Sequence, residues 1–132
     1  MIIDTSVIIA ILTDEPERAR FLDILQDTPD TTISAGSLIE LAAVITRKLG
    51  SRYIVVAEQL LEQLEIRIAP VSEEQAQIGW RAYQEFGIGT QHPAKLNFGD
   101  CFAYALAKAT GEPLLFKGDD FSSTDIRSAL PL

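Results

Sequence analysis

Cysteine is almost absent from the sequence, because Cys101 is the only one among 132 residues. A lone cysteine permits no internal disulfide, and this usage fits a reducing cytoplasm. Its position beside the apolar face of a predicted helix favours a small core residue over a reactive thiol. We therefore expect a cytoplasmic protein whose fold does not depend on disulfides.

Long hydrophobic runs are also missing, although 47% of the residues are hydrophobic. The longest runs cover only a few residues, so we expect no membrane span. Since the sequence opens directly on the strand-like MIID, we expect no signal peptide either. The sequence contains no repeat, low-complexity tract or linker, and its length suits one core. These features predict a single domain over residues 1–132 without membrane contact.

Basic residues are scarce, with 11 Lys and Arg against 19 Asp and Glu and a net charge of −8. This is the wrong sign for a protein that binds a phosphate backbone through surface charge alone. Three explanations stay open. The partner is not a polyanion, some acids hold cations that reverse the local field, or the partner is a basic protein.

Several common catalytic patterns are absent as well. The sequence has no Ser/His/Asp order, no Gly-rich phosphate loop and no Cys/His metal spacing, and His92 is its only histidine. Triad chemistry, a phosphate loop and a thiolate–imidazole metal site therefore have no support in the sequence.

The most informative stretch that is present covers residues 96–121. Its pattern predicts a turn, a helix from about 100 to 110 that ends at Gly111, a short buried strand and an acidic turn. Strand-like segments near 1–4, 31–34 and 66–71 alternate with helical patterns in the same way. This alternation predicts an α/β fold with a parallel sheet and helices on both faces.

Carboxylates stand at the ends of the first and last predicted strands. Asp4 ends the first strand, Asp119 and Asp120 follow the last, and Glu40 and Asp100 lie in first turns of predicted helices. Ligands of open α/β sheets bind outside the carboxyl ends of the strands. Because several close carboxylates cannot all stay ionised unaided, a hard cation such as Mg²⁺ would resolve the repulsion and could activate water.

Each acid also has a purely structural explanation. Ser37 and Glu40 have capping-box spacing, which alone would account for Glu40, and Asp4 or Asp100 could serve as an ordinary cap or favour a helix dipole. Ser72 begins a second capping box, and the helix after it carries Trp80, which we expect to be a core anchor rather than a base-stacking platform.

Three segments together resemble the PIN-domain ribonuclease toxins of the VapC type. They are IIDTSVIIAIL at the start, SLIELAAV in the middle and NFGDCFAYALAKATGEPLLFKGDDFSSTDI near the end. The resemblance covers essentially the whole chain. It implies a PIN-like three-layer α/β/α fold with a short, mostly parallel central sheet of four to five strands.

The resemblance also implies an activity, which is cleavage of RNA, often tRNA or ribosomal RNA, by an endoribonuclease that uses Mg²⁺ or Mn²⁺. Asp4 and Asp100 match the primary metal ligands, and Glu40 matches the third acid. The fourth acid corresponds to Asp120, with Asp119 as the alternate, and Ser6 matches a small polar residue that supports the first Asp.

Partners and substrate contacts follow from the same resemblance. It implies a VapB-type antitoxin that covers the acidic groove, and a homodimer. The candidates for contact with RNA are His92, Lys95 and Lys117.

Two alternatives stay open: a PIN-fold binding module without activity, and another Mg²⁺-dependent phosphohydrolase. A phosphatase with a nucleophilic Asp4 would need a second Asp two residues later, where Ser6 stands. A receiver domain would need a paired acid after the first strand, and that acid is missing too.

Overall fold

The computed structural model describes residues 1–130, so the last two residues of the predicted domain lie outside it. In this part of the chain, strands and helices follow one another as β1 (Ile2–Ile3), α1 (Thr5–Leu12), α2 (Arg18–Asp27), β2 (Thr32–Ser34), α3 (Ala35–Lys48), α4 (Tyr53–Gln63), β3 (Arg67–Ala69), α5 (Glu73–Phe86), α6 (Asp100–Thr110) and β4 (Leu114–Leu115). Among the described residues, none of the helices has both the length and the apolar character needed to cross a membrane.

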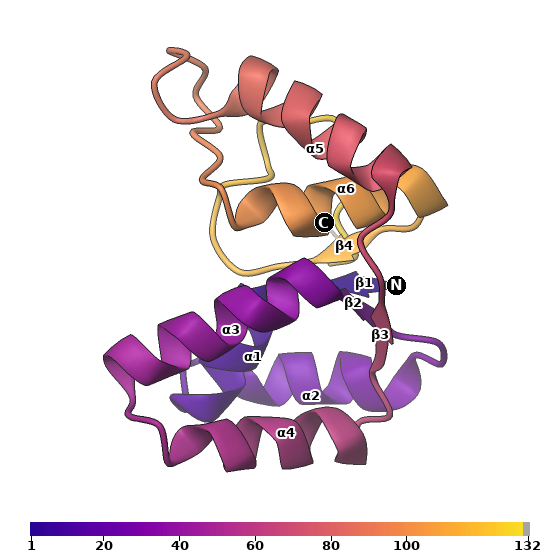
Figure 1. Cartoon of the computed structure of the whole chain (residues 1–132). Coiled ribbons are helices and arrows are strands. Elements are labelled where there is room, and N and C mark those ends of the chain that lie inside the picture. Colours follow the sequence, from indigo (N-terminus) through magenta and orange to yellow (C-terminus); the bar gives the residue numbers. More distant parts are fainter. Residues whose placement is uncertain (131–132) are drawn as a thin grey trace.

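The strands form one parallel sheet in the order β3-β2-β1-β4. Helices α1 to α4 cover one face of the sheet and α5 and α6 the other, as Figure 1 shows. Successive strand residues point to opposite layers: Ile2 and Leu114 pack under α5 and α6, whereas Ile3 and Leu115 pack against α1 to α4. This arrangement confirms the predicted three-layer α/β/α fold with a short parallel sheet.

Because the strands are parallel, their carboxyl ends lie along one edge of the sheet. Strands β1 and β4 are direct neighbours, with Ile2 opposite Leu114 and Ile3 opposite Leu115. The segments after these two strands, which carry Asp4 and Asp119–Asp120, therefore leave the sheet side by side.

The helix boundaries confirm two local predictions and contradict one. Gly111 adopts a left-handed conformation (φ 71°) and ends α6, and the Ser72 hydroxyl accepts a hydrogen bond from the Gln75 amide at 3.1 Å. The predicted cap at Ser37 is wrong, because Ser34 caps α3 by accepting a hydrogen bond from the Gly36 amide at 3.2 Å. Ser37 is instead a buried residue in the first turn. Glu40 therefore lies beyond the cap, and capping does not explain it.

The predicted core position of Trp80 is also wrong, since this side chain is 70% exposed. Helix α5 carries two apolar stripes, and the one formed by Ile78, Ala82 and Phe86 packs on α6 and the sheet. Trp80 belongs to the other stripe. Cys101, in contrast, is buried as predicted.

Candidate active site

Asp4 lies directly after β1 and caps α1. Its Oδ2 accepts a hydrogen bond from the Ser6 amide at 3.1 Å, and only 5% of the residue is exposed. Within residues 1–130, its buried Oδ1 has no hydrogen-bond partner. Burial raises the pKa of Asp4, and the negative charge of Asp120 adds to the rise. A buried carboxylate oxygen without a donor is costly, so this atom fits a proton or a cation.

Asp100 is the first residue of α6 and is 6% exposed. A reciprocal pair of hydrogen bonds fixes it: the Asn97 amide donates to Asp100 Oδ2 at 3.0 Å, and the Asp100 amide donates to Asn97 Oδ1 at 2.9 Å. Burial raises the pKa of Asp100 to about 7, and the charges of Asp4, Asp120 and Glu40 contribute to the increase. Asp100 therefore lies within electrostatic reach of three other acids.

Glu40 is half-buried in α3, and burial followed by the charge of Asp4 raises its pKa. Its carboxylate lies against the chain at Gly99, where a β carbon would be only 1.2 Å from Glu40 Oε2. Glu40 therefore reaches across from α3 to the residue that immediately precedes Asp100.

The turn after β4 carries the two candidates for the fourth acid, Asp119 and Asp120, and both are exposed. Burial is the main reason for the raised pKa of Asp4 and of Asp100, and of the two turn acids it is Asp120 whose charge adds to it. The Ser6 hydroxyl accepts a hydrogen bond from the Lys117 amide at 3.0 Å, which ties the start of α1 to the end of β4. Ser6 thus joins the two segments that carry strand-end acids.

A second side-chain hydrogen bond fixes the start of α1, and this one joins it to α3. The buried Thr5 hydroxyl donates to the Ser37 carbonyl at 3.2 Å and holds the start of α1 against the first turn of α3. This contact brings Asp4 toward the helix of Glu40. Threonine is a common residue at helix starts, and no local sequence pattern indicates this long-range contact.

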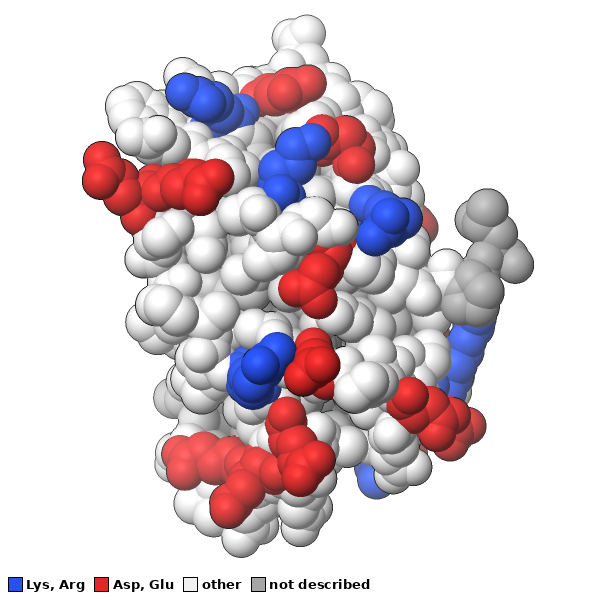
Figure 2. All heavy atoms as spheres, turned by 90° about the vertical axis from the view of Figure 1, so that its right-hand side faces the viewer, with Lys and Arg blue, Asp and Glu red and all other residues white. Residues whose placement is uncertain are grey.

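The basic candidates occupy different settings. His92 Nδ1 accepts a hydrogen bond from the Ala94 amide at 3.1 Å, and Lys95 is exposed. The Lys117 ammonium forms ion pairs with Glu15 and Glu17, so its charge is already compensated. On the face in Figure 2, basic side chains of the described residues stand among acidic ones and do not merge into a continuous basic surface.

The donors available to a metal are carboxylate oxygens, which suit Mg²⁺ and Mn²⁺. In residues 1–130, no three His, Cys, Asp or Glu side chains stand close enough together to form a ready metal-binding group. The charges of these acids nevertheless act on one another, and Asp4 Oδ1 has no hydrogen-bond partner among the described residues. Mg²⁺ commonly takes one or two carboxylates and keeps several waters, and this donor set fits that habit.

Comparisons with known proteins identify relatives of this chain. Ribonuclease VapC42 of Mycobacterium tuberculosis is 42% identical over 129 residues, covering 98% of each chain. The solved structure of M. tuberculosis VapC20, described as a sarcin-ricin loop cleaving toxin, has a TM-score of 0.77 at 18% identity and covers 98% of each chain. A toxin–antitoxin complex from Klebsiella pneumoniae gives a TM-score of 0.67 at 18% identity, over 94% of this chain and 92% of that chain.

The two solved structures are too distant in sequence to establish more than the fold. The VapC42 relative, however, matches nearly end to end, and residues 1–127 match the PIN domain family. The chain therefore belongs to the PIN domain family and, within it, to the VapC ribonucleases.

Proposed function

We propose that this protein is a divalent-metal-dependent endoribonuclease that acts as the toxin of a toxin–antitoxin pair. Its family membership supports cleavage of RNA. The single observation that carries the metal-dependent chemistry is the buried Asp4 carboxylate, whose unpartnered Oδ1 lies within electrostatic reach of other acids. An acid cluster of this kind needs a cation to be fully ionised at neutral pH.

In this proposal, Asp4 and Asp100 hold Mg²⁺ or Mn²⁺, and Glu40 and Asp120 complete the surroundings. When bound, the cation polarises a phosphodiester and lowers the pKa of an attacking water. Asn97 keeps the Asp100 carboxylate in place through its amide hydrogen bond. Ser6 keeps the Asp4 and Asp120 segments together. Glu40 is the residue we propose to orient the water.

The substrate is an RNA, and a structured tRNA or ribosomal RNA is the class we propose. A chain of net charge −8 repels phosphates, so cation binding at the acids would favour approach at this point of the surface. Lys95 and His92, in the loop before α6, are the proposed RNA contacts. Lys117 is a weaker candidate, because Glu15 and Glu17 already compensate it.

The acid cluster also suits a second ligand, the basic segment of an antitoxin. Toxin–antitoxin complexes share this fold. A guanidinium or ammonium group placed among Asp4, Asp100 and Glu40 would supply the positive charge that these carboxylates lack. We propose that the antitoxin blocks the enzyme by occupying the position of the cation.

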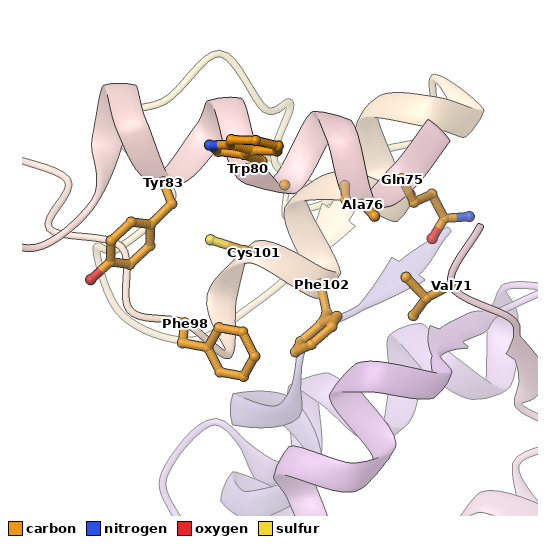
Figure 3. A pocket seen from close by; sticks show the side chains of 10 residues that line it. Val71, Gln75, Ala76, Trp80, Tyr83, Phe98, Cys101 and Phe102 are labelled. Carbon is orange, nitrogen blue, oxygen red and sulfur yellow. The ribbon is translucent and has the colours of Figure 1, made fainter. Parts of the chain in front are cut away.

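A homodimer is the proposed assembly, and an apolar face on α5 and α6 is its proposed interface. A hollow of about 370 Å³ lies on this face. Figure 3 shows the aromatic side chains of Trp80, Tyr83, Phe98 and Phe102 around it. Taking about 200 Å² for a whole aromatic side chain, the exposed fractions of 70% for Trp80, 40% for Tyr83 and 75% for Phe98 leave about 370 Å² to cover. That is nearly half of the roughly 800 Å² that each partner buries in a standard interface.

Charge favours a second copy of this chain as the occupant of that face. Among the described residues, no Asp, Glu, Lys or Arg lines the hollow, although the chain as a whole carries a net charge of −8. Two such chains repel each other elsewhere, so they can associate most easily through an uncharged surface. A twofold interface also needs projections and a hollow on the same patch, and Trp80 and Phe98 beside the hollow provide both.

One experiment tests the nuclease. Purified protein is incubated with total RNA in EDTA, Mg²⁺ or Mn²⁺, and cleaved ends are mapped. We expect specific cleavage that needs the cation and is lost in Asp4→Asn but kept in Asp23→Asn, an exposed acid on α2. Binding of RNA without cleavage under all conditions would instead favour the binding module.

A second experiment tests the assembly. Light scattering at about 100 μM should find a dimer for the parent and for Val55→Glu, which changes an exposed apolar residue on α4. It should find a monomer for Trp80→Glu. A monomeric parent, or a dimeric Trp80→Glu variant, would rule out this interface.

A further inference from the structure

Gly99, immediately before Asp100, has a backbone conformation that does not call for glycine. Its φ of −64° and ψ of −36° are helical angles that any residue adopts. The backbone angles therefore do not explain why residue 99 is a glycine. At Gly111 they do, because its φ is 71°.

The space around Gly99 supplies the explanation. A β carbon at this position would lie 1.2 Å from Glu40 Oε2 and 2.1 Å from Glu40 Cδ, whereas real β carbons essentially never approach other atoms within 3.0 Å. The Glu40 carboxyl group thus occupies the volume that a side chain of residue 99 would fill. Gly79 on α5 is different, because a β carbon there would meet its nearest atom, the Cys101 carbonyl oxygen, at 3.5 Å.

A second glycine makes the fit reciprocal. At Gly36, in the first turn of α3, a β carbon would lie 2.1 Å from Phe102 Cδ1. Figure 3 shows the Phe102 side chain pointing from α6 toward α3. The Glu40 side chain of α3 therefore occupies the space beside Gly99, and the Phe102 side chain of α6 occupies the space beside Gly36. Such close packing transmits small displacements between the two helices.

We propose that Gly99 is a positioning residue. Because it has no side chain, it leaves room for the Glu40 carboxylate to lie beside Asp100. The charge of Glu40 already acts on Asp100. An alanine at residue 99 would force this carboxylate to another rotamer, away from the acid cluster. The consequence for metal binding rests on the proposed function, but the placement of the Glu40 carboxylate at Gly99 does not.

A set of thermal unfolding measurements in metal-free buffer tests only whether Gly99 makes room for the side chain of residue 40. Gly99→Ala is introduced into the parent, into Glu40→Gln, which keeps the size of the side chain, and into Glu40→Ala, which removes it. We expect Gly99→Ala to lower Tm by about 2 to 4 °C more in the first two backgrounds than in the third, because only there must the end of a long side chain at residue 40 move to another rotamer. An unchanged Tm in all three backgrounds would overturn the proposal. The control Gly79→Ala should not lower Tm in any background.

Equal falls in all three backgrounds would overturn the proposal, because the penalty would then belong to the α6 cap and not to Glu40. A fall in the parent that disappears in Glu40→Gln would also overturn it, since charge rather than volume would be responsible.

Calorimetric titration with Mn²⁺ tests the consequence. Gly99→Ala should weaken Mn²⁺ binding at least about tenfold, which corresponds to about 1.4 kcal/mol. Combining Gly99→Ala with the shorter Glu40→Asp should restore part of the affinity, because the carboxylate then has room near the cluster. If the parent binds no Mn²⁺, the proposed function fails, but the unfolding measurements still test the placement of Glu40 at Gly99. If the parent binds and Gly99→Ala binds equally well, Gly99 does not position Glu40 for the metal.

Discussion

Replacing Asp100 by asparagine should stabilise the metal-free protein above neutral pH, although it removes a proposed metal ligand. The folded chain holds the pKa of Asp100 at about 7, above its ordinary 3.8, chiefly through burial. The folded state therefore binds this proton more tightly than the unfolded state. The stabilisation from protonated Asp100 is complete below about pH 4 and is lost as the pH rises toward and past 7. Asparagine keeps the size of the side chain and can still accept the hydrogen bond from the Asn97 amide.

The pKa gives the size of the effect. The interval from 3.8 to about 7, at about 1.36 kcal/mol for each pKa unit, sets an upper limit of about 4 kcal/mol. Asp100 is only 6% exposed, so solvent screens it little, but protonation of its acidic neighbours would reduce the gain to as little as about 2 kcal/mol. With an unfolding entropy of about 2.1 cal/mol/K per residue, 132 residues convert this range to a Tm rise of about 7 to 14 °C.

Thermal unfolding followed by circular dichroism, in EDTA at pH 8 and pH 4.5, measures the effect directly. The rise for Asp100→Asn should be largest at pH 8 and small at pH 4.5. Asp23→Asn, which removes the same charge from an exposed position on α2, should change Tm little at either pH. A lower Tm at pH 8, or a rise of equal size at both values, would refute the idea that Asp100 is held in an unfavourable ionised state.

Three further outcomes follow from the same site. Millimolar Mg²⁺ or Mn²⁺ should raise the Tm of the parent by linkage and leave that of Asp4→Asn unchanged; a flat titration of the parent up to tens of millimolar would contradict a metal site. Asp120→Asn should lower the RNA cleavage rate at least about tenfold and Asp119→Asn less than twofold, because the charge of Asp120 acts on Asp4 and Asp100; the reverse order would exchange the two roles. Cys101 should react with iodoacetamide at pH 8 at least about tenfold more slowly in the folded than in the urea-unfolded chain, because burial raises its pKa to about 11; equal rates would show the thiol to be accessible.

The placement of the strand-end acids could be predicted from sequence because it depends on topology. Alternating strands and helices predict a parallel sheet, and a parallel sheet brings the carboxyl ends of its strands to one edge. Asp4 and the Asp119–Asp120 pair follow directly from that rule. Glu40 does not, because the spacing of Ser37 and Glu40 matched a helix cap. The cap lies three residues earlier, at Ser34, and only the resemblance to a family singled out Glu40.

Side-chain direction was the part that periodicity did not supply. Helix α5 has apolar residues on two faces, and the pattern alone does not tell which face meets α6 and the sheet. The buried face carries Ala82 and Phe86, whereas Trp80 stands on the exposed one. The contact of Glu40 with Gly99 joins residues far apart in the sequence, and it depends on how closely two helices approach. No local pattern encodes such a distance.

The pairing of β1 with β4 has a consequence for the life of this chain on the ribosome. Residue 2 pairs with residue 114, so the sheet edge that holds Asp4 closes only after the chain has been synthesised through β4. Contacts of such high sequence separation form late, because a long loop must close before they form. A partly translated chain therefore has the first acid but not the last strand. With the proposed roles of Asp4 and Asp120, the nascent chain gains the ability to cleave RNA only after the segment from β4 to Asp120 has been synthesised.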